Sequence, residues 1–141
     1  MNPMNLRRRV ACGVVLGVIF ILLEFLVHGV LLSGVYKQNA LVWRPEDQMK
    51  NLFPLMFVGQ FLFGVFFGLV YAQGYEPRRG PVGQGFRYGL IMGMMLAPMN
   101  SLGWYVILPI PSSLGVQWFV AGFAEMVLLG LAASVIYKPA E

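Results

Sequence analysis

The residues of this chain best suited to chemistry are two glutamates and one histidine inside long apolar stretches. Glu24 and Glu125 are the acidic residues within those stretches, and His28, the single histidine, follows Glu24 by four positions. A carboxylate at the centre of a bilayer is costly unless it is paired or protonated, so a residue in this position is a candidate for binding protons or cations. The structural alternative is a pair of protonated acids hydrogen-bonded to polar neighbours, with a neutral His28 bonded to Glu24.

Two amides, Gln60 and Asn100, occupy comparable places in other apolar stretches. At 1.5 Å per residue, each of these amides and each of the two acids lies within about 5 Å of the centre of its segment. The sequence therefore predicts one polar layer near the membrane midplane, a candidate proton site composed of Glu24, His28, Gln60, Asn100 and Glu125.

The chain offers little for other kinds of site. It has one cysteine, Cys12, and one histidine, so it lacks the second His or Cys ligand expected near His28 in a zinc site. The sequence shows no nucleophile–base pair and no phosphate-binding loop. We expect no bound metal, no cofactor, no catalytic residues and no enzymatic activity.

Composition indicates a membrane protein. Hydrophobic residues make up 58% of the 141 residues and charged residues 11%, whereas a soluble domain has about 25% charged residues. The net charge of +4 lies in bases that flank apolar runs, as membrane anchors do, so no nucleic-acid partner is expected. Segments long enough to span a bilayer are predicted at about residues 10–35, 52–72, 86–108 and 114–137.

The connections between these segments differ in length. Pro54 is expected in the first turn of the second segment, and the prolines and serines of residues 109–113 predict a tight turn that makes the last two helices antiparallel. Residues 74–85 hold two prolines and are expected to be non-helical. Residues 37–51 are expected to form an outer loop of about 15 residues, with Trp43 resting among lipid headgroups.

Basic residues predict the orientation. Seven of them fall on one side and three on the other, which places both termini in the cytoplasm. The larger set is Arg7, Arg8, Arg9, Arg78, Arg79, Arg87 and Lys138, and the smaller is Lys37, Arg44 and Lys50. The first apolar stretch is longer than a signal-peptide core, so we expect an uncleaved anchor. The fold class predicted is an all-α membrane protein, a four-helix antiparallel bundle forming a single domain over residues 1–141.

Small residues mark the faces through which helices meet in lipid. Spacings of four residues between glycines occur in three of the segments and predict close helix packing there. The glycines concerned are Gly13, Gly17, Gly64, Gly68, Gly89 and Gly93, with Gly85 extending the last pair.

The part of the chain from Tyr88 to Lys138 resembles small four-helix bacterial membrane proteins of unknown function. The residues that carry the resemblance are Leu108-Pro109-Ile110-Pro111, Gln117-Trp118-Phe119 and Gly122-Phe123-Ala124-Glu125, with Trp43-Arg44-Pro45 in the outer loop. The resemblance implies a place in the bacterial inner membrane and implies no catalytic residues.

Small multidrug resistance transporters are similar in one respect, a membrane-buried glutamate in the first of four helices, the position that Glu24 would take. This chain departs from them in its long outer loop, its second buried acid, Glu125, and a proline, Pro98, beside Asn100. We therefore expect a non-enzymatic accessory or assembly component in the lipid bilayer, in a homo-oligomer or a larger complex. The alternative is a small proton-coupled transporter that uses Glu24 and Glu125.

Overall fold

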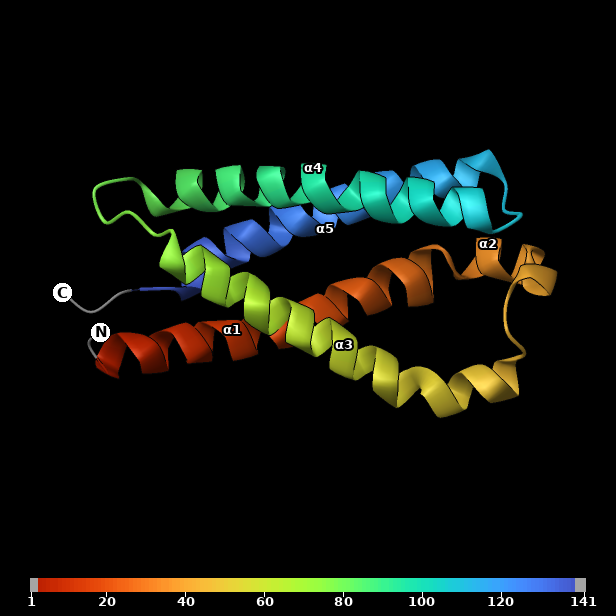
Figure 1. The fold of residues 1–141 in the computed structure, drawn as a ribbon, viewed down its shortest axis with the longest axis horizontal. Helices are drawn as coiled ribbons and strands as arrows, with labels where there is room; N and C mark the ends of the chain where they lie inside the picture. Colours follow the sequence, from red (N-terminus) through yellow and green to blue (C-terminus); the bar gives the residue numbers. More distant parts are fainter. Residues whose placement is uncertain (1–2, 139–141) are drawn as a thin grey trace.

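A computed structural model describes residues 3–138, with side chains from Leu6 onward, and this part of the chain consists of helices and short connections (Figure 1). Residues 1, 2 and 139–141, which include both predicted cytoplasmic termini, lie outside the described residues. The elements are α1 (Pro3–Glu24), the π-helix η1 (Phe25–Leu31), α2 (Ser33–Gln38), the 3₁₀ turn η2 (Ala40–Val42), α3 (Glu46–Gln73), α4 (Pro81–Ile107) and α5 (Ser112–Ile136).

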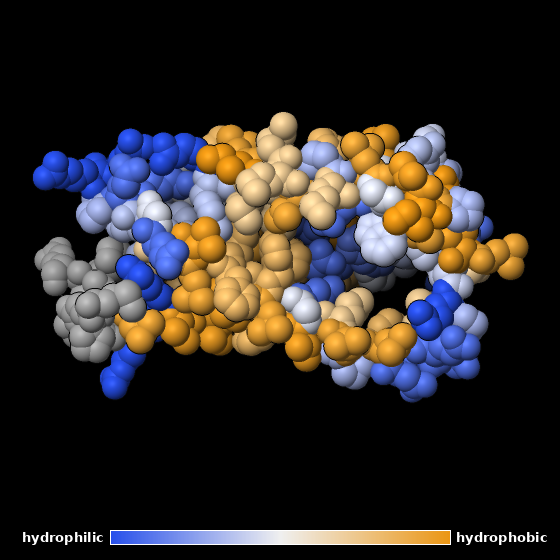
Figure 2. Space-filling view, in the orientation of Figure 1, coloured by the Kyte–Doolittle hydropathy of each residue, from blue (hydrophilic) through white to orange (hydrophobic). Residues whose placement is uncertain are grey.

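Four of the helical stretches are long and apolar enough to cross a membrane. They are Leu6–Leu31, Glu46–Gln73, Pro81–Ile107 and Ser112–Ile136. The shortest has 25 residues, or about 37 Å of helix, which exceeds the ~30 Å hydrocarbon core of a bilayer. Apolar side chains cover the middle of the molecule in Figure 2, and hydrophilic side chains gather toward its two ends.

The outer connection is shorter than the sequence predicts, because α3 begins at Glu46 rather than near residue 52. Acidic Glu46 and Asp47 occupy its first turn, where the helix dipole favours negative charge. Lys50 pairs with Glu46 one turn earlier, at 2.9 Å. Two corrections follow: residues 37–51 are mostly helical, and Pro54 lies inside α3 rather than in its first turn.

The start of α4 also differs from the prediction for residues 74–85. Proline needs no N–H partner at the beginning of a helix, so Pro81 opens α4, and Gly83 and Gly85 follow within it. The side chain of Gln84 fixes the preceding loop: its amide donates to the carbonyl oxygens of Glu76 and Arg79 at 2.9 and 3.0 Å, and its oxygen accepts from the Glu76 N–H at 2.8 Å.

Glycines bring the helices together in two pairs. A Cβ atom placed on Gly64 of α3 would lie 2.5 Å from the Cα of Gly17 in α1, and one on Gly68 would lie 2.9 Å from the Cα of Gly13. Their backbones are therefore in direct contact. In the second pair, Gly89 of α4 faces the backbone of α5 in the same way, Gly85 packs against Gly130, and Gly93 meets the ring of Phe123.

The two helix pairs, α1 with α3 and α4 with α5, meet mainly along a seam between α1 and α5 (Figure 1). In the half of the molecule that holds the start of α1 and the end of α5, this seam is packed with apolar side chains. Leu16, Leu129 and Ala133 are fully buried there, and Cys12 is nearly so. Toward the other end, the first half of α3 diverges, and every residue from Lys50 to Gly59 is exposed.

Candidate functional site

The candidate site lies where the apolar seam ends and α1 changes its winding. Residues Phe25–Leu31 form a π-helix, closed by a hydrogen bond of 2.9 Å from the Leu32 N–H to the Val27 carbonyl. π-helical turns are rare and occur frequently at functional sites. Glu24 is the last residue before this turn and His28 lies within it, so both side chains are presented on the same face of the chain.

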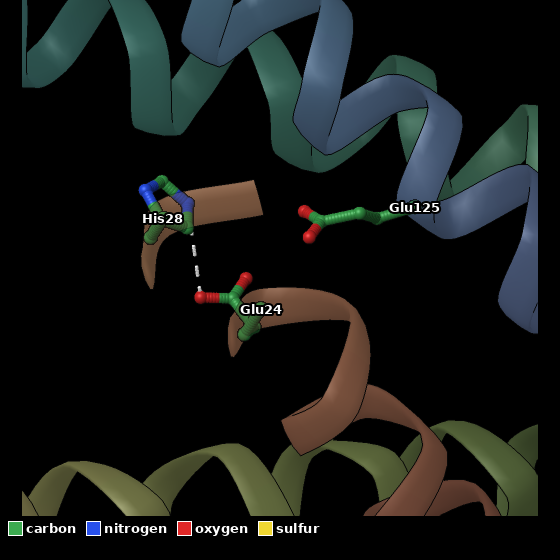
Figure 3. A group of neighbouring side chains, drawn as sticks. All are labelled: Glu24, His28 and Glu125. Atoms are coloured by element: carbon green, nitrogen blue, oxygen red, sulfur yellow. Dashed lines mark ion pairs between the residues drawn. The ribbon is translucent and has the colours of Figure 1, made fainter. Parts of the chain in front are cut away.

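Three ionisable side chains converge there from the two helix pairs. Glu24 and His28 come from the first pair, and Glu125, near the middle of α5, reaches across from the second (Figure 3). One potential ligand atom from each of the three lies within 4.8 Å of the others. The Nε2 atom of His28 is 3.8 Å from a carboxylate oxygen of Glu24. We call Glu24, His28 and Glu125 the seam cluster.

The ion pair within the seam cluster joins Glu24 to His28. Lys50 pairs with Glu46, and Arg79 and Arg87 pair with Glu76, at the exposed ends of the molecule. Two ionised carboxylates at the short separation of the seam cluster repel one another strongly in a medium of low dielectric constant. The cluster therefore favours the uptake of positive charge, as protons or as a cation.

Hydrogen bonding in the seam cluster is incomplete. Gln60 of α3 donates from its amide to Glu24 at 3.2 Å. Within residues 3–138, however, the Oε1 atoms of Glu125 and Gln60 are buried and have no hydrogen-bond partner. Glu125 is only 3% exposed. Because buried polar atoms are normally paired, these two oxygens leave hydrogen-bonding capacity unused at the seam cluster.

Tyr36 is hydrogen-bonded to the imidazole ring of His28. Its hydroxyl is hydrogen-bonded to Nδ1 of His28 and accepts a hydrogen bond from the indole N–H of Trp118 at 2.8 Å. Trp43 donates to the Tyr36 carbonyl at 3.1 Å and packs edge-on against its ring. With Nδ1 engaged, the Nε2 atom of His28 is the one directed to the seam cluster, so Tyr36 sets the orientation of the ring.

Exposure falls from one member of the cluster to the next. The side chain of His28 is 38% exposed and that of Glu24 is 21% exposed, while Glu125 is buried. Figure 2 shows this face of the molecule hollowed between α3 and the other helices, with hydrophilic side chains visible inside the hollow. From the open side inward, the exposed fraction of the side chains therefore falls from His28, through Glu24, to Glu125.

One predicted member of the polar layer does not join it. Asn100 is exposed on α4, and the residues of α4 that face α5 are Gly89, Gly93, Ala97 and Ser101. These four repeat at a spacing of four, so the inward row reaches Ser101 and leaves Asn100 one position, about 100° of rotation, away. The prediction for Asn100 is corrected accordingly, and the hydroxyl of Ser101 is bonded to the Ala97 carbonyl at 2.7 Å.

Tyr36, Trp118 and Trp43 are the supporting residues that the sequence did not reveal. Aromatic residues near segment ends are typical of a belt at the membrane surface, and Trp43 is expected there on that basis. The three rings pack against one another, and the ring of Tyr36 stacks on that of His28. The exposed N–H and O–H groups that suit such residues to an interface also suit them to a buried network, so type and position alone do not separate the two.

In comparisons with known proteins, no family model matches the chain, and neither a curated protein nor a solved structure matches it.

Proposed function

We propose that the protein is a small, non-enzymatic, proton-coupled membrane transporter, with Glu24 and Glu125 as the site at which protons and a cationic substrate compete. The observation that carries the proposal is the convergence of Glu24, His28 and Glu125 within 4.8 Å at the junction of two helix pairs. A purely structural polar layer would pair its buried oxygens, whereas an oxygen of Glu125 has no hydrogen-bond partner among residues 3–138.

The two helix pairs supply the moving parts of the proposed mechanism. Helices within each pair are in backbone contact at glycines, and in this mechanism each pair would move as one body. Rocking of one pair against the other would change the distance between Glu24 and Glu125 and open the seam to alternate sides, as repeats do in other transporters. The gap beside the first half of α3 is the open side in the present state.

The proposal includes an orientation. Seven basic residues lie at the end that holds the start of α1, the α3–α4 connection and the end of α5. This asymmetry favours an antiparallel bundle with both termini in the cytoplasm, in the inner membrane of a bacterium. The hollow at the α2 end then faces the outside.

The alternative function, an accessory or assembly component, is favoured by a groove beside the turn between α4 and α5. This groove has a volume of about 240 Å³ and lies between α4 and α5, where Ser112 and Gly115 are among its lining residues. Small residues on an open face of a membrane helix permit close approach of another helix.

Proton release separates the two functions. The full chain in lipid nanodiscs would be placed in weakly buffered solution, and candidate cationic substrates would be added to wild type, Glu24→Gln and Glu125→Gln. Glu46→Gln is the matched control, because Glu46 is an exposed carboxylate on α3. Release that is retained in Glu46→Gln and lost in both cluster variants supports the transporter. Absence of release in wild type, with only thermal stability changed in the variants, favours the accessory role.

A further inference from the structure

We propose that the cation taken by the seam cluster is a divalent first-row transition metal ion, bound by the Nε2 atom of His28 and one carboxylate oxygen each from Glu24 and Glu125. This assignment rests on the proposed function, since it names the class of substrate that would exchange with protons. It stands on three observations: the ligand set, its geometry and the unpartnered buried oxygen of Glu125.

The ligand set selects the class of ion. Imidazole nitrogen suits zinc, iron and nickel, carboxylate oxygen suits magnesium, calcium and manganese, and a mixed set suits ions between these groups. Thiolate ligands are missing from the seam cluster, because the single cysteine, Cys12, is buried four turns of helix away from His28. The matching ions are therefore divalent first-row transition metals, among them manganese, iron, cobalt, nickel and zinc.

The geometry needs only a small contraction. The three ligand atoms lie within 4.8 Å of one another, and ligands of a tetrahedral ion at bond lengths near 2.1 Å stand about 3.4 Å apart. Rotation of the glutamate side chains, which reach the site from opposite helix pairs in Figure 3, covers that difference. Three protein ligands leave coordination positions for water, and an open position suits an ion that must also leave.

The burial and hydrogen bonding of Glu125 support the metal site independently of the ligand set. It is 3% exposed, and its Oε1 atom has no hydrogen-bond partner in the described part of the chain. Its carboxylate is directed toward Glu24 and His28 in Figure 3. A divalent ion would satisfy this oxygen and would neutralise the two carboxylates together.

In this assignment, Tyr36 is the hydrogen-bond partner of the histidine that binds the metal. Such ligands usually give their second ring nitrogen to a hydrogen bond, which fixes the tautomer and the ring direction. The Tyr36 hydroxyl holds Nδ1 of His28 and is itself held by Trp118. In the metal-bound state, Nδ1 carries the proton and donates it to the Tyr36 oxygen, which leaves Nε2 unprotonated for the ion.

Direct binding of Zn²⁺, Mn²⁺ and Co²⁺ tests the assignment. The full chain, with any histidine tag removed because His28 is the sole native histidine, is dialysed in nanodiscs against each ion, and bound metal is measured by mass spectrometry. The expected result is one ion per chain in wild type and in Glu46→Gln, with affinity at least about 100-fold lower in His28→Gln and Glu125→Gln. Equal binding in all four proteins, or none in wild type, would overturn the assignment.

A measurement on wild type alone covers the case in which a variant fails to fold. The visible spectrum of one equivalent of bound Co²⁺ reports nitrogen and oxygen ligation, and a spectrum equal to that of hydrated Co²⁺ would overturn the assignment. Proton uptake without metal is measured in parallel. Uptake that depends on Glu125, combined with no metal binding, defeats the metal site and leaves the proton site standing. Metal binding without any proton exchange defeats the proposed coupling instead.

Discussion

The seam cluster shows how much of the chemistry of a buried site depends on residues outside it. Glu24, His28 and Glu125 carry the charge, yet the ring of His28 is oriented by the hydroxyl of Tyr36. Burial raises the pKa of that hydroxyl to about 12, although its hydrogen bond with Trp118 acts in the opposite direction. The Tyr36 hydroxyl therefore remains a hydrogen-bonding group throughout the range in which carboxylates and imidazole titrate.

Tryptophan fluorescence should report protonation of the seam cluster. Trp118 and Trp43 both contact Tyr36, which is bonded to His28, so a change of charge in the cluster alters their surroundings. We expect a fluorescence transition between about pH 4 and 9, a range in which Tyr36 stays protonated and contributes nothing. The amplitude of the transition should be smaller in Glu125→Gln. In Tyr36→Phe, protonation of the cluster should no longer change the tryptophan fluorescence.

The exposed Trp104 is replaced by phenylalanine in every protein of this experiment, to remove its constant background. Glu46→Gln serves as the carboxylate control. A transition of the same size and midpoint in Glu24→Gln, Glu125→Gln and the control would show that the indoles respond to something other than the cluster.

At the level of the helices, glycine determines how closely each pair packs and so where the site residues lie. Gly13 and Gly17 allow α3 to approach α1 at backbone contact, which brings the side chain of Gln60 within reach of Glu24. His28 lies within the π-helical turn, four residues after Glu24 and on the same face. The polar site thus depends on glycine packing about two and three turns along α1 from Glu24.

Two glycines of α3 provide a matched test. A Cβ on Gly64 would meet the Gly17 backbone at 2.5 Å, whereas nothing lies within 4 Å of a Cβ on Gly59. We expect Gly64→Ala to lower stability by about 1–3 kcal/mol because the helices must separate. Gly59→Ala should be neutral or stabilising by up to about 1 kcal/mol. Unfolding in mixed detergent measures both, and equal stabilities would contradict the packing described.

The four long apolar helices could be predicted from the sequence, because the hydropathy of a helix depends only on the residues within that segment. The candidates Glu24, His28 and Glu125 are also readable, because an ionisable group in an apolar run is rare. Their proximity is not, since it depends on which helices become neighbours and on the π-helical turn. Asn100 was misplaced for a related reason: a one-position error in the inward row of a helix turns a side chain by about 100°.

For the molecule as a whole, the important division is between a tight half and an open half. Apolar side chains fill the seam around Leu16 and Leu129. Beyond Gln60, toward the start of α3, that helix has no buried residue. The seam cluster lies at the boundary between these halves, so it is held by rigid packing on one side and reachable on the other.

The position of Glu125 near the middle of α5 also has an electrical consequence. A charge that crosses the whole membrane gains or loses about 2.3 kcal/mol per 100 mV, and a charge at this depth feels roughly half of that. Two carboxylates that release two protons for each divalent ion carry no net charge in a cycle. Exchange in proteoliposomes should then run at the same rate at zero and at −100 mV set with a potassium gradient and valinomycin, whereas uptake of the ion without protons would follow the voltage.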